Sequence, residues 1–256
     1  KGKNNLSIIG ESRDHTIVRA RNGNSINDGT RGRPQFLAQS SNNLTLENFT
    51  IHNTATRGAG DGQAEALFYD NSGRLIAKNM YFYSEQDTLL LNGYVWVYNS
   101  IVAGNVDFIW GGPQVALFEN SEIRSIGDSN NPSSDAGGYV LQSRSPQNGL
   151  GFVFLNSTFT RGVGPAGNTP GNGKSALARG ANKDTTFDSV AFINCKMDSH
   201  IRAEGFDPGR TLNPATSSAN LGYREYGSTT LNGSRIDLGQ RYSVYRLNDS
   251  EYQQTY

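Results

Sequence analysis

The sequence is poor in the residues on which several common active sites are built. It has one cysteine, Cys195, so the chain can form no internal disulfide and no zinc cluster of cysteines. We expect Cys195 to be a small buried side chain. The three histidines, His15, His52 and His200, stand alone, and no serine lies in a glycine-flanked elbow. Zinc-hydrolase and serine-triad chemistry are therefore disfavoured, and we expect carboxylates and amides to act without a metal or cofactor.

Long apolar runs and net charge are also missing. No segment approaches the roughly 18 consecutive apolar residues of a membrane helix. The 23 basic and 23 acidic residues cancel, so no global field draws the chain to nucleic acid or to a bilayer. The hydrophobic share of 35% together with 30 glycines is normal for a globular protein. We therefore expect a folded protein with neither a nucleic-acid nor a membrane partner.

What the sequence does have is an internal repeat. Short alternating segments rich in Val, Ile, Phe and Tyr each reach an asparagine and then resume, with a basic spacing of about 20 residues that insertions lengthen. Asparagine suits a tight turn because it tolerates left-handed backbone, and stacked asparagines can bond to one another. The recurring residues are Asn48, Asn79, Asn99, Asn120, Asn156 and Asn194.

A unit of this length cannot bury its apolar face alone and must stack on its neighbours. The repeat therefore predicts an all-β solenoid of parallel strands in one domain, residues 1–256. Polar insertions at 127–138 and 162–174 are expected to gather as loops on one face, often the binding face. From residue 205 the asparagine rhythm stops, and we expect 205–256 to be an irregular tail that covers or flanks the solenoid.

The phase of the repeat brings two carboxylates together. Asp87 and Asp107 follow Asn79 and Asn99 at the same spacing, so they are expected on successive coils, about 4.8 Å apart. Like charges so close are unfavourable, and the pKa of one carboxyl should rise. A pair with divergent pKa values favours acid/base or acid/nucleophile catalysis. The alternative is that the aspartates bind turn amides or a calcium ion.

Several motifs resemble the pectin methylesterase family, over nearly the whole chain and in the family's order. QDTL at 86–89 and GNVDFIWG at 104–111 resemble its two aspartate motifs. GQAEAL at 62–67 is similar to its QAVAL stretch, LARGA at 177–181 to its LGRPW, and YVLQSRSP from 139 to its AQGR segment. The resemblance implies a right-handed parallel β-helix that hydrolyses methyl esters of galacturonate in pectin. It also implies that the family's first coil and cap are absent from this chain.

Carried over by position, the resemblance implies a role for five residues. Asp107 would be the nucleophile that attacks the ester carbonyl, and Asp87 the acid that assists departing methanol and then the base that activates water. Gln63 and Gln86 would donate to the oxyanion, and Arg179 would pair with Asp107 and keep it ionised. The expected partner is a methylated polysaccharide, and the expected protein is a secreted monomer, extracellular or periplasmic.

Departures from the family pattern concern the sugar-binding cleft. Gly180 and Ala181 replace the proline and tryptophan of LGRPW, so a sugar would lose an aromatic partner at Ala181. Trp110 replaces a phenylalanine and is a candidate for substrate binding, although strand alternation predicts that it lies on the face opposite Asp107, which favours a core role. Tyr94 and Trp96 are further cleft candidates, although alternation should bury one set of residues of their strand.

Other functions remain open on the sequence. Parallel β-helices also carry pectate lyases and polygalacturonases, and two carboxylates about 5 Å apart match a retaining glycosidase. The glutamines favour an acyl oxyanion over an oxocarbenium ion. An esterase or thioesterase with another acyl substrate is a second alternative, which Ala181 supports. A non-catalytic carbohydrate-binding β-helix is a third, against which the retained aspartates, glutamines and arginine argue.

Overall fold

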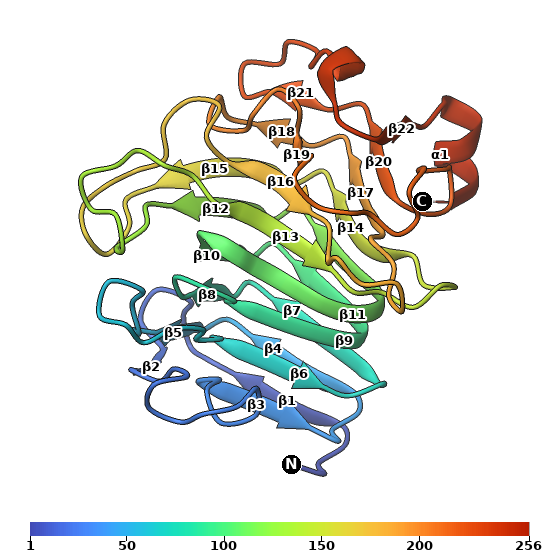
Figure 1. Cartoon of the computed structure of the whole chain (residues 1–256). Coiled ribbons are helices and arrows are strands. Elements are labelled where there is room, and N and C mark those ends of the chain that lie inside the picture. Colours follow the sequence, from blue (N-terminus) through green and yellow to red (C-terminus); the bar gives the residue numbers. More distant parts are fainter. Residues whose placement is uncertain (256) are drawn as a thin grey trace.

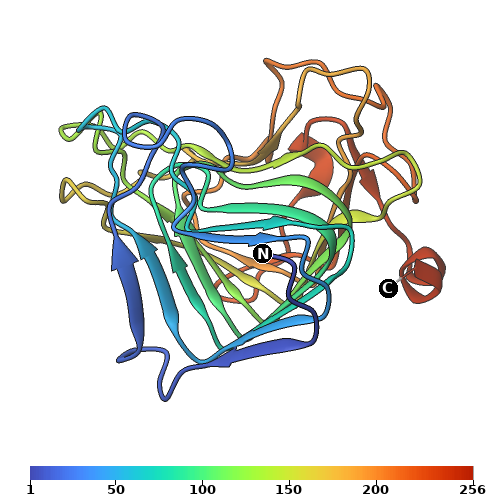
Figure 2. The ribbon, with the colours of Figure 1, turned by 90° about the horizontal axis from the view of Figure 1, so that it is seen from below.

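Three short strands and the corners between them make up each coil, and successive coils stack along one axis (Figure 1). A computed structural model describes residues 1–255; residue 256 of the expected domain lies outside the described part. All strand pairs that connect successive coils are parallel. Viewed close to the axis, the coils superimpose around a common interior (Figure 2). The predicted right-handed parallel β-helix is confirmed.

The strands form three faces. The first face contains β3 (Phe36–Gln39), β6 (Leu67–Asp70), the first part of β9 (Leu89–Tyr98) and of β11 (Val106–Glu119), β13 (Tyr139–Ser143), β16 (Ala176–Arg179) and β19 (Phe206–Asp207). The second face contains β1 (Leu6–Ile9), β4 (Leu44–Glu47), β7 (Arg74–Lys78), the later parts of β9 and β11, β14 (Gly151–Leu155), β17 (Val190–Ile193), β20 (Tyr223–Tyr226) and β22 (Val244–Arg246). The third face contains β2 (Ile17–Ala20), β5 (Thr50–Asn53), β8 (Tyr81–Tyr83), β10 (Ile101–Gly104), β12 (Glu122–Ile126), β15 (Thr158–Gly162), β18 (Lys196–Met197) and β21 (Thr229–Thr230).

The six recurring asparagines occupy the corner between the second and third faces. All six have positive φ, between 47° and 64°, as the repeat predicts. The Asn79 side-chain amide donates to Oδ1 of Asn48 at 2.6 Å, which confirms that asparagines of neighbouring coils bond to one another. Local turn chemistry therefore keeps successive coils in register.

Inward side chains fill the space between the faces. Phe118, Phe154 and Phe192 stack on successive coils, with ring centroids 4.9 and 5.1 Å apart. The next position in this column is Glu225, which is buried and binds Arg241, with Nε 2.9 Å from Oε2. Arg241 also donates to the carbonyl oxygens of Arg202 and Ala203. A buried ion pair therefore closes this end of the aromatic column.

The long insertions gather at one corner, where the third face passes to the first. The segments there are 21–35, 54–66, 127–138 and 163–175, and their loops extend to one side of the coils in Figure 1. The Asn168 side chain joins two of them, donating to the carbonyl oxygens of Asp128, Asn131 and Ser134. The expectation that 127–138 and 162–174 cluster on one face is confirmed.

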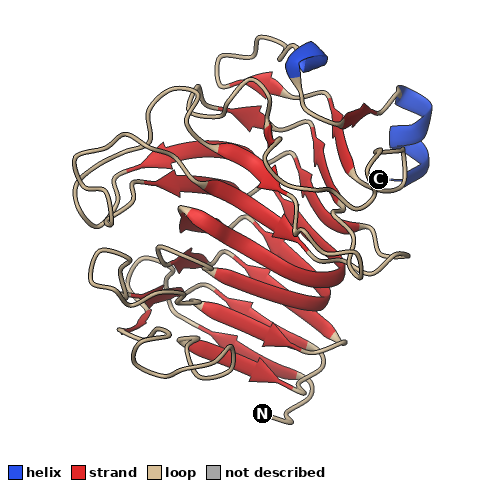
Figure 3. Ribbon diagram, in the orientation of Figure 1, coloured by secondary structure: helices blue, strands red, loops and turns tan. Residues whose placement is uncertain are grey.

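The tail differs from the prediction. Residues 205–256 were expected to be irregular, but β19, β20 and β21 add a further coil, and β22 continues the second face. The sequence pattern missed this coil because Gly227, with φ 66°, takes the turn position next to Asn194. Beyond it lie a 3₁₀ turn (Leu238–Gln240) and the helix α1 (Asp249–Thr255), the helical segments coloured in Figure 3.

No helix among residues 1–255 is both long enough and apolar enough to cross a membrane.

Replacing Asn79 tests the asparagine corner. We expect Asn79→Ala to lower the free energy of unfolding by about 2–3 kcal/mol, because alanine strains the left-handed backbone by about 1–2 kcal/mol and a hydrogen bond of about 1 kcal/mol is lost. Asn79→Gly should lose only about 1 kcal/mol, since glycine adopts this backbone freely. Urea unfolding measures both. A glycine variant no more stable than the alanine variant would contradict the assignment.

Candidate active site

The two aspartates stack on neighbouring coils of the first face. The bridge between Gln86 and Val106, and the pairing of Leu89 with Ile109, place Asp87 opposite Asp107 in register. Both have positive φ, 63° and 45°, which sets them apart from the extended strand that follows. Both are buried, at 3% and 8% exposure. The predicted stacking at the strand spacing of about 4.8 Å is confirmed.

Asp107 is bound by an arginine from two coils further along. Arg179, the last residue of β16, donates through Nε to Oδ1 at 2.8 Å and through Nη2 to Oδ2. The guanidinium itself lies over the ring of Tyr139, 4.2 Å from its centroid. Gln142 donates to Asp107 Oδ2 at 3.4 Å. The carboxyl group is thereby held in one orientation, and the predicted pairing of Arg179 with Asp107 is present.

Asp87 has the opposite environment. Burial is the largest cause that raises the pKa of Asp87 well above its ordinary value, and the negative charges of Glu65 and Asp107 add to the rise. Arg33 opposes the rise, with its Nη2 3.4 Å from Oδ2. The sequence predicts that the pKa of one carboxyl rises because the other lies close; the pKa of Asp87 does rise, but burial and Glu65 contribute to the rise before Asp107 does.

The two predicted glutamines lie on neighbouring coils: Gln86 on the coil of Asp87, and Gln63 on the coil before it. The carbonyl oxygen of Gln86 accepts from the backbone N–H of Ala64 at 3.3 Å, so Gln63 and Gln86 are neighbours across the coil boundary. The side-chain carbonyl of Gln63 accepts from Arg33 Nη1 at 2.5 Å. Both glutamine side chains are partly exposed. Neither side chain is therefore fully enclosed by the protein.

Four residues of the site were missed from the sequence: Arg33, Glu65, Gln142 and Arg144. Gln142 and Arg144 lie in YVLQSRSP, and Arg144 donates to Gln142 Oε1 through Nε at 3.0 Å and Nη2 at 2.6 Å. Glu65 lies in GQAEAL, where an acidic residue among apolar neighbours was an available signal. Arg33 belongs to the loop at 21–35 and no pattern in the sequence connects it to Asp87.

Among residues 1–255, no group of three or more His, Cys, Asp or Glu side chains is arranged to hold a metal ion. The charged groups at the aspartates are carboxylates and guanidinium groups alone. The arrangement places an arginine-bound carboxyl group beside a second carboxyl group whose pKa is raised, next to side-chain amides. That combination suits acyl transfer.

Comparison with known proteins identifies the family. The model of the pectinesterase family matches residues 1–254. The chain belongs to the pectinesterase family. It is accordingly a carboxylic ester hydrolase, and the lyase and polygalacturonase alternatives find no support. A search of curated protein sequences finds no match.

Solved structures of pectin methylesterases share the fold. One from Erwinia chrysanthemi has a TM-score of 0.74 at 23% identity, covering 99% of this chain and 81% of that one. One from Yersinia enterocolitica has a TM-score of 0.74 at 22% identity, covering 98% and 85%. A pectin methylesterase variant in complex with a hexasaccharide has a TM-score of 0.75 at 22% identity, covering 99% and 83%.

Trp110 of this pectinesterase lies on the same side as Asp107, and the prediction that it faces the core was wrong. The strand register shifts between Val106 and Ile109, which breaks the alternation. Trp110 packs in a small outer cluster with Phe68, Leu90 and Leu37 and is 8% exposed. Arg144 lies over its ring at 4.6 Å. Its role in substrate binding stays a prediction.

Tyr94 and Trp96 are not brought to the acid pair. They follow the bend at Gly93 and belong to the second face, whereas the aspartates belong to the first. Both are exposed, and the buried set of their strand is Val95 and Val97. Trp96 Nε1 donates to Glu119 at 3.0 Å. Their place on the second face does not support the prediction that they line a cleft at the acid pair.

Ala181 does not leave an open space in the enzyme. It is 7% exposed, and its N–H donates to Asp188 Oδ1 at 2.9 Å. The other oxygen of Asp188 accepts from the N–H of Asn213, and Thr211 donates to Asn182, so the segment before β20 is tied to this loop. The alternative of a bulkier acyl substrate filling a vacated space loses its basis, while the pairing of Arg179 with Asp107 is as LARGA implies.

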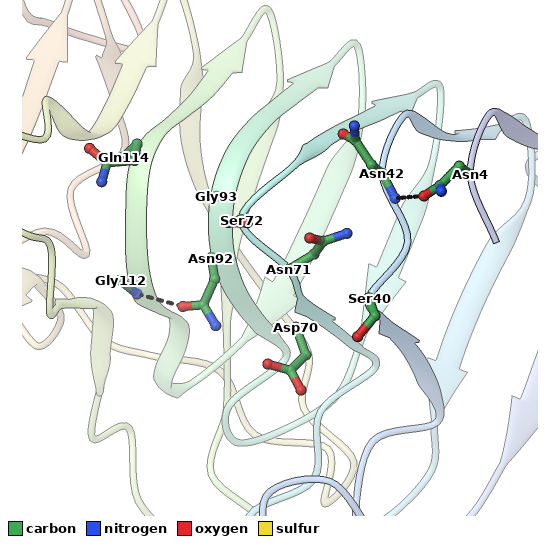
Figure 4. A pocket seen from close by; sticks show the side chains of 10 residues that line it. All are labelled: Asn4, Ser40, Asn42, Asp70, Asn71, Ser72, Asn92, Gly93, Gly112 and Gln114. Atoms are coloured by element: carbon green, nitrogen blue, oxygen red, sulfur yellow. Dashed lines mark hydrogen bonds between the residues drawn. The ribbon is translucent and has the colours of Figure 1, made fainter. Parts of the chain in front are cut away.

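A polar groove of about 650 Å³ lies away from the aspartates, at the corner between the first and second faces. Side chains from successive coils line it, including Asn42, Asn71, Asn92 and Gln114 (Figure 4). Its lining includes none of Asp87, Asp107, Gln63, Gln86 and Arg179. Its residues are therefore separate from the candidate active site.

The binding of both oxygens of Asp107 by the Arg179 guanidinium gives a testable prediction. We expect Arg179→Lys to lower the turnover number for methanol release by about 10- to 100-fold, the equivalent of one charge-assisted hydrogen bond, since lysine cannot bind both oxygens of Asp107 in one plane. Arg124→Lys is the matched control: Arg124 binds Glu122 at 2.8 Å and lies over Tyr81, but on the third face. Full activity of Arg179→Lys would show that only the positive charge of Arg179 matters, and not its binding to both oxygens of Asp107.

Proposed function

We propose that this pectinesterase hydrolyses the methyl esters of galacturonate in pectin with Asp107 as nucleophile and Asp87 as general acid and base. One observation carries the proposal. Two carboxyl groups stack in register on adjacent coils, one clamped by Arg179 and the other buried beside Glu65. This arrangement supports opposite protonation states in one site, which nucleophilic ester hydrolysis requires.

In the first half of the reaction, a carboxylate oxygen of Asp107 attacks the ester carbonyl carbon. Negative charge develops on the former carbonyl oxygen, where amide N–H groups of Gln63 and Gln86 donate to it. The tetrahedral intermediate collapses by breaking the bond to the methoxy oxygen, and Asp87 gives that oxygen its proton. Methanol leaves, and the galacturonyl group remains on Asp107 as an anhydride.

In the second half, Asp87 is a carboxylate and takes a proton from water. The hydroxide attacks the galacturonyl carbonyl, a second oxyanion forms against the same amides, and Asp107 departs as a carboxylate. The product acid ionises as it leaves. Asp87 is again protonated and Asp107 ionised, so one ester and one water have become one carboxylate, one methanol and one proton.

The substrate class and the setting follow from this chemistry. The pectin methylesterases that share the fold include two in complex with hexasaccharides, which supports a polysaccharide substrate. We propose that the loops at 127–138 and 163–175 border the bound polymer, because they gather at the corner from which the strand of Asp107 starts. We further propose a secreted monomer, since such a polymer is reached outside the cell.

Replacing the nucleophile tests the proposal most simply. We expect Asp107→Asn to abolish methanol release from highly methylated pectin, by about 10⁴-fold or more, with the circular dichroism spectrum and the urea midpoint preserved. Asp14→Asn serves as the control, because Asp14 is exposed and lies in the turn between β1 and β2, away from the loops at 127–138 and 163–175. A folded Asp107→Asn enzyme with substantial turnover would rule out the nucleophile. An acyl-thioester assay beside it checks the remaining substrate alternative.

Replacing Asp87 should have a smaller effect, with a diagnostic pH dependence. We expect Asp87→Asn to lose about 10²–10⁴-fold in turnover, the usual contribution of a general acid/base. In the wild type, the raised pKa of Asp87 keeps the proton above the ordinary carboxyl range, so turnover should fall only as pH rises through that raised pKa. Residual activity of Asp87→Asn that keeps this alkaline limb would assign the acid to another group.

A further inference from the structure

Arg33 is a buried cation that joins three groups of the site. It is 4% exposed and comes from the loop at 21–35, outside the strands. Its Nε lies 3.0 and 2.9 Å from the two oxygens of Glu65, and its Nη2 lies 2.8 Å from Oε1 of the same residue. Nη1 donates to Gln63 Oε1 at 2.5 Å, and Nη2 reaches Asp87 Oδ2 at 3.4 Å.

The bond to Gln63 decides which end of that amide faces outward. A guanidinium only donates, so the group that faces Arg33 must be the side-chain oxygen. The NH₂ end of Gln63 then points away from Arg33. An oxyanion site needs N–H donors already oriented toward the developing charge, and a freely rotating amide would present its oxygen part of the time. Arg33 therefore fixes the donor direction of Gln63.

Glu65 offsets the effect that the positive charge of Arg33 would have on Asp87. An unpaired guanidinium beside Asp87 would favour the ionised carboxylate, which cannot act as an acid. Glu65 is fully buried and binds Arg33 with both oxygens, so its charge offsets that of the guanidinium. The pair thus orients Gln63 without leaving a net positive charge beside Asp87.

We propose that the Arg33–Glu65 ion pair is a positioning device for ester hydrolysis. Arg33 holds the Gln63 amide with its N–H groups toward the ester, and Glu65 cancels the charge of Arg33. This inference rests on the proposed function, because it assumes that Gln63 donates to the oxyanion. Glu65 contacts Asp87 only through its charge, and Arg33 reaches the carboxyl of Asp87 only at the long distance of 3.4 Å, so both are positioning residues.

A double-mutant cycle tests the proposal through kcat and KM on methylated oligogalacturonides. We expect Gln63→Ala to lower kcat by about 10²–10³-fold, the usual loss of one oxyanion donor. Arg33→Lys should lower kcat by about 10- to 100-fold, with KM changed less than about twofold, because only the orientation of the donor is lost. The double variant should be no slower than Gln63→Ala alone, within about twofold, since both act through one amide.

Multiplicative losses in the double variant, or full activity of Arg33→Lys, would overturn the inference. Arg31→Lys is the matched control from the same loop. Arg31 binds Asp70 at 2.6 Å and is exposed, so its replacement should leave kcat unchanged. If Gln63→Ala itself retains full turnover, the oxyanion role in the proposed function fails. If Gln63→Ala is impaired and Arg33→Lys is not, the inference alone fails.

Two further variants guard against misfolding and separate the two partners. Arg33→Met with Glu65→Gln removes both buried charges together, so it should fold, by circular dichroism and urea midpoint, and still show the loss in kcat. A folded neutral pair with full kcat would overturn the role of Arg33.

Glu65→Gln alone leaves Arg33 uncompensated beside Asp87. The charged groups that face Asp87 are Glu65, Arg33, Asp107 and Arg144. Replacing Glu65 removes a negative charge that raises the pKa of Asp87. The decline of kcat at alkaline pH should therefore move to lower pH. An unmoved limb would overturn the role of Glu65.

Discussion

Two carboxyl groups held one strand spacing apart cannot both carry full charge without a large penalty, and the site is organised around this constraint. The structure resolves it by giving the two groups different surroundings. Asp107 accepts hydrogen bonds from two nitrogens of Arg179, while Asp87 is buried near the negative charge of Glu65. In the proposed mechanism this unfavourable proximity becomes useful, because the arginine-bound nucleophile lies beside a carboxyl group whose raised pKa favours the protonated form.

The β-helix supplies this proximity through its register. Asn79 and Asn99 fix the corners of two successive coils, and the aspartates follow at the same phase on the first face. The partners of the aspartates then come from other coils and from the loops at the adjoining corner: Arg179 from β16, and Arg33 from a loop that precedes Asp87 by 54 residues. The solenoid therefore determines the spacing of the two aspartates, and residues distant in the sequence provide the charged groups around them.

This division explains what could be predicted from the sequence. The coil period, the asparagine corners and the stacked aspartates depend on local turn chemistry, which repeats visibly in the sequence. Arg33 and Glu65 could not be connected, because no local pattern relates an arginine in one loop to a glutamate in the corresponding loop of the next coil. Trp110 was placed on the wrong side because a register shift cancels simple alternation. The last coil was not predicted, because Gly227 replaces asparagine at its turn and the asparagine repeat is interrupted.

The protonation of Asp87 is the most direct test of this account. Infrared difference spectra at pH 7 between the wild type and Asp87→Asn, and between the wild type and Asp107→Asn, separate the two carboxyl groups. We expect Asp87→Asn to remove the carbonyl band of a protonated carboxyl, and Asp107→Asn to remove only carboxylate bands. A protonated band lost with Asp107, or none lost with Asp87, would contradict the assignment of acid and nucleophile.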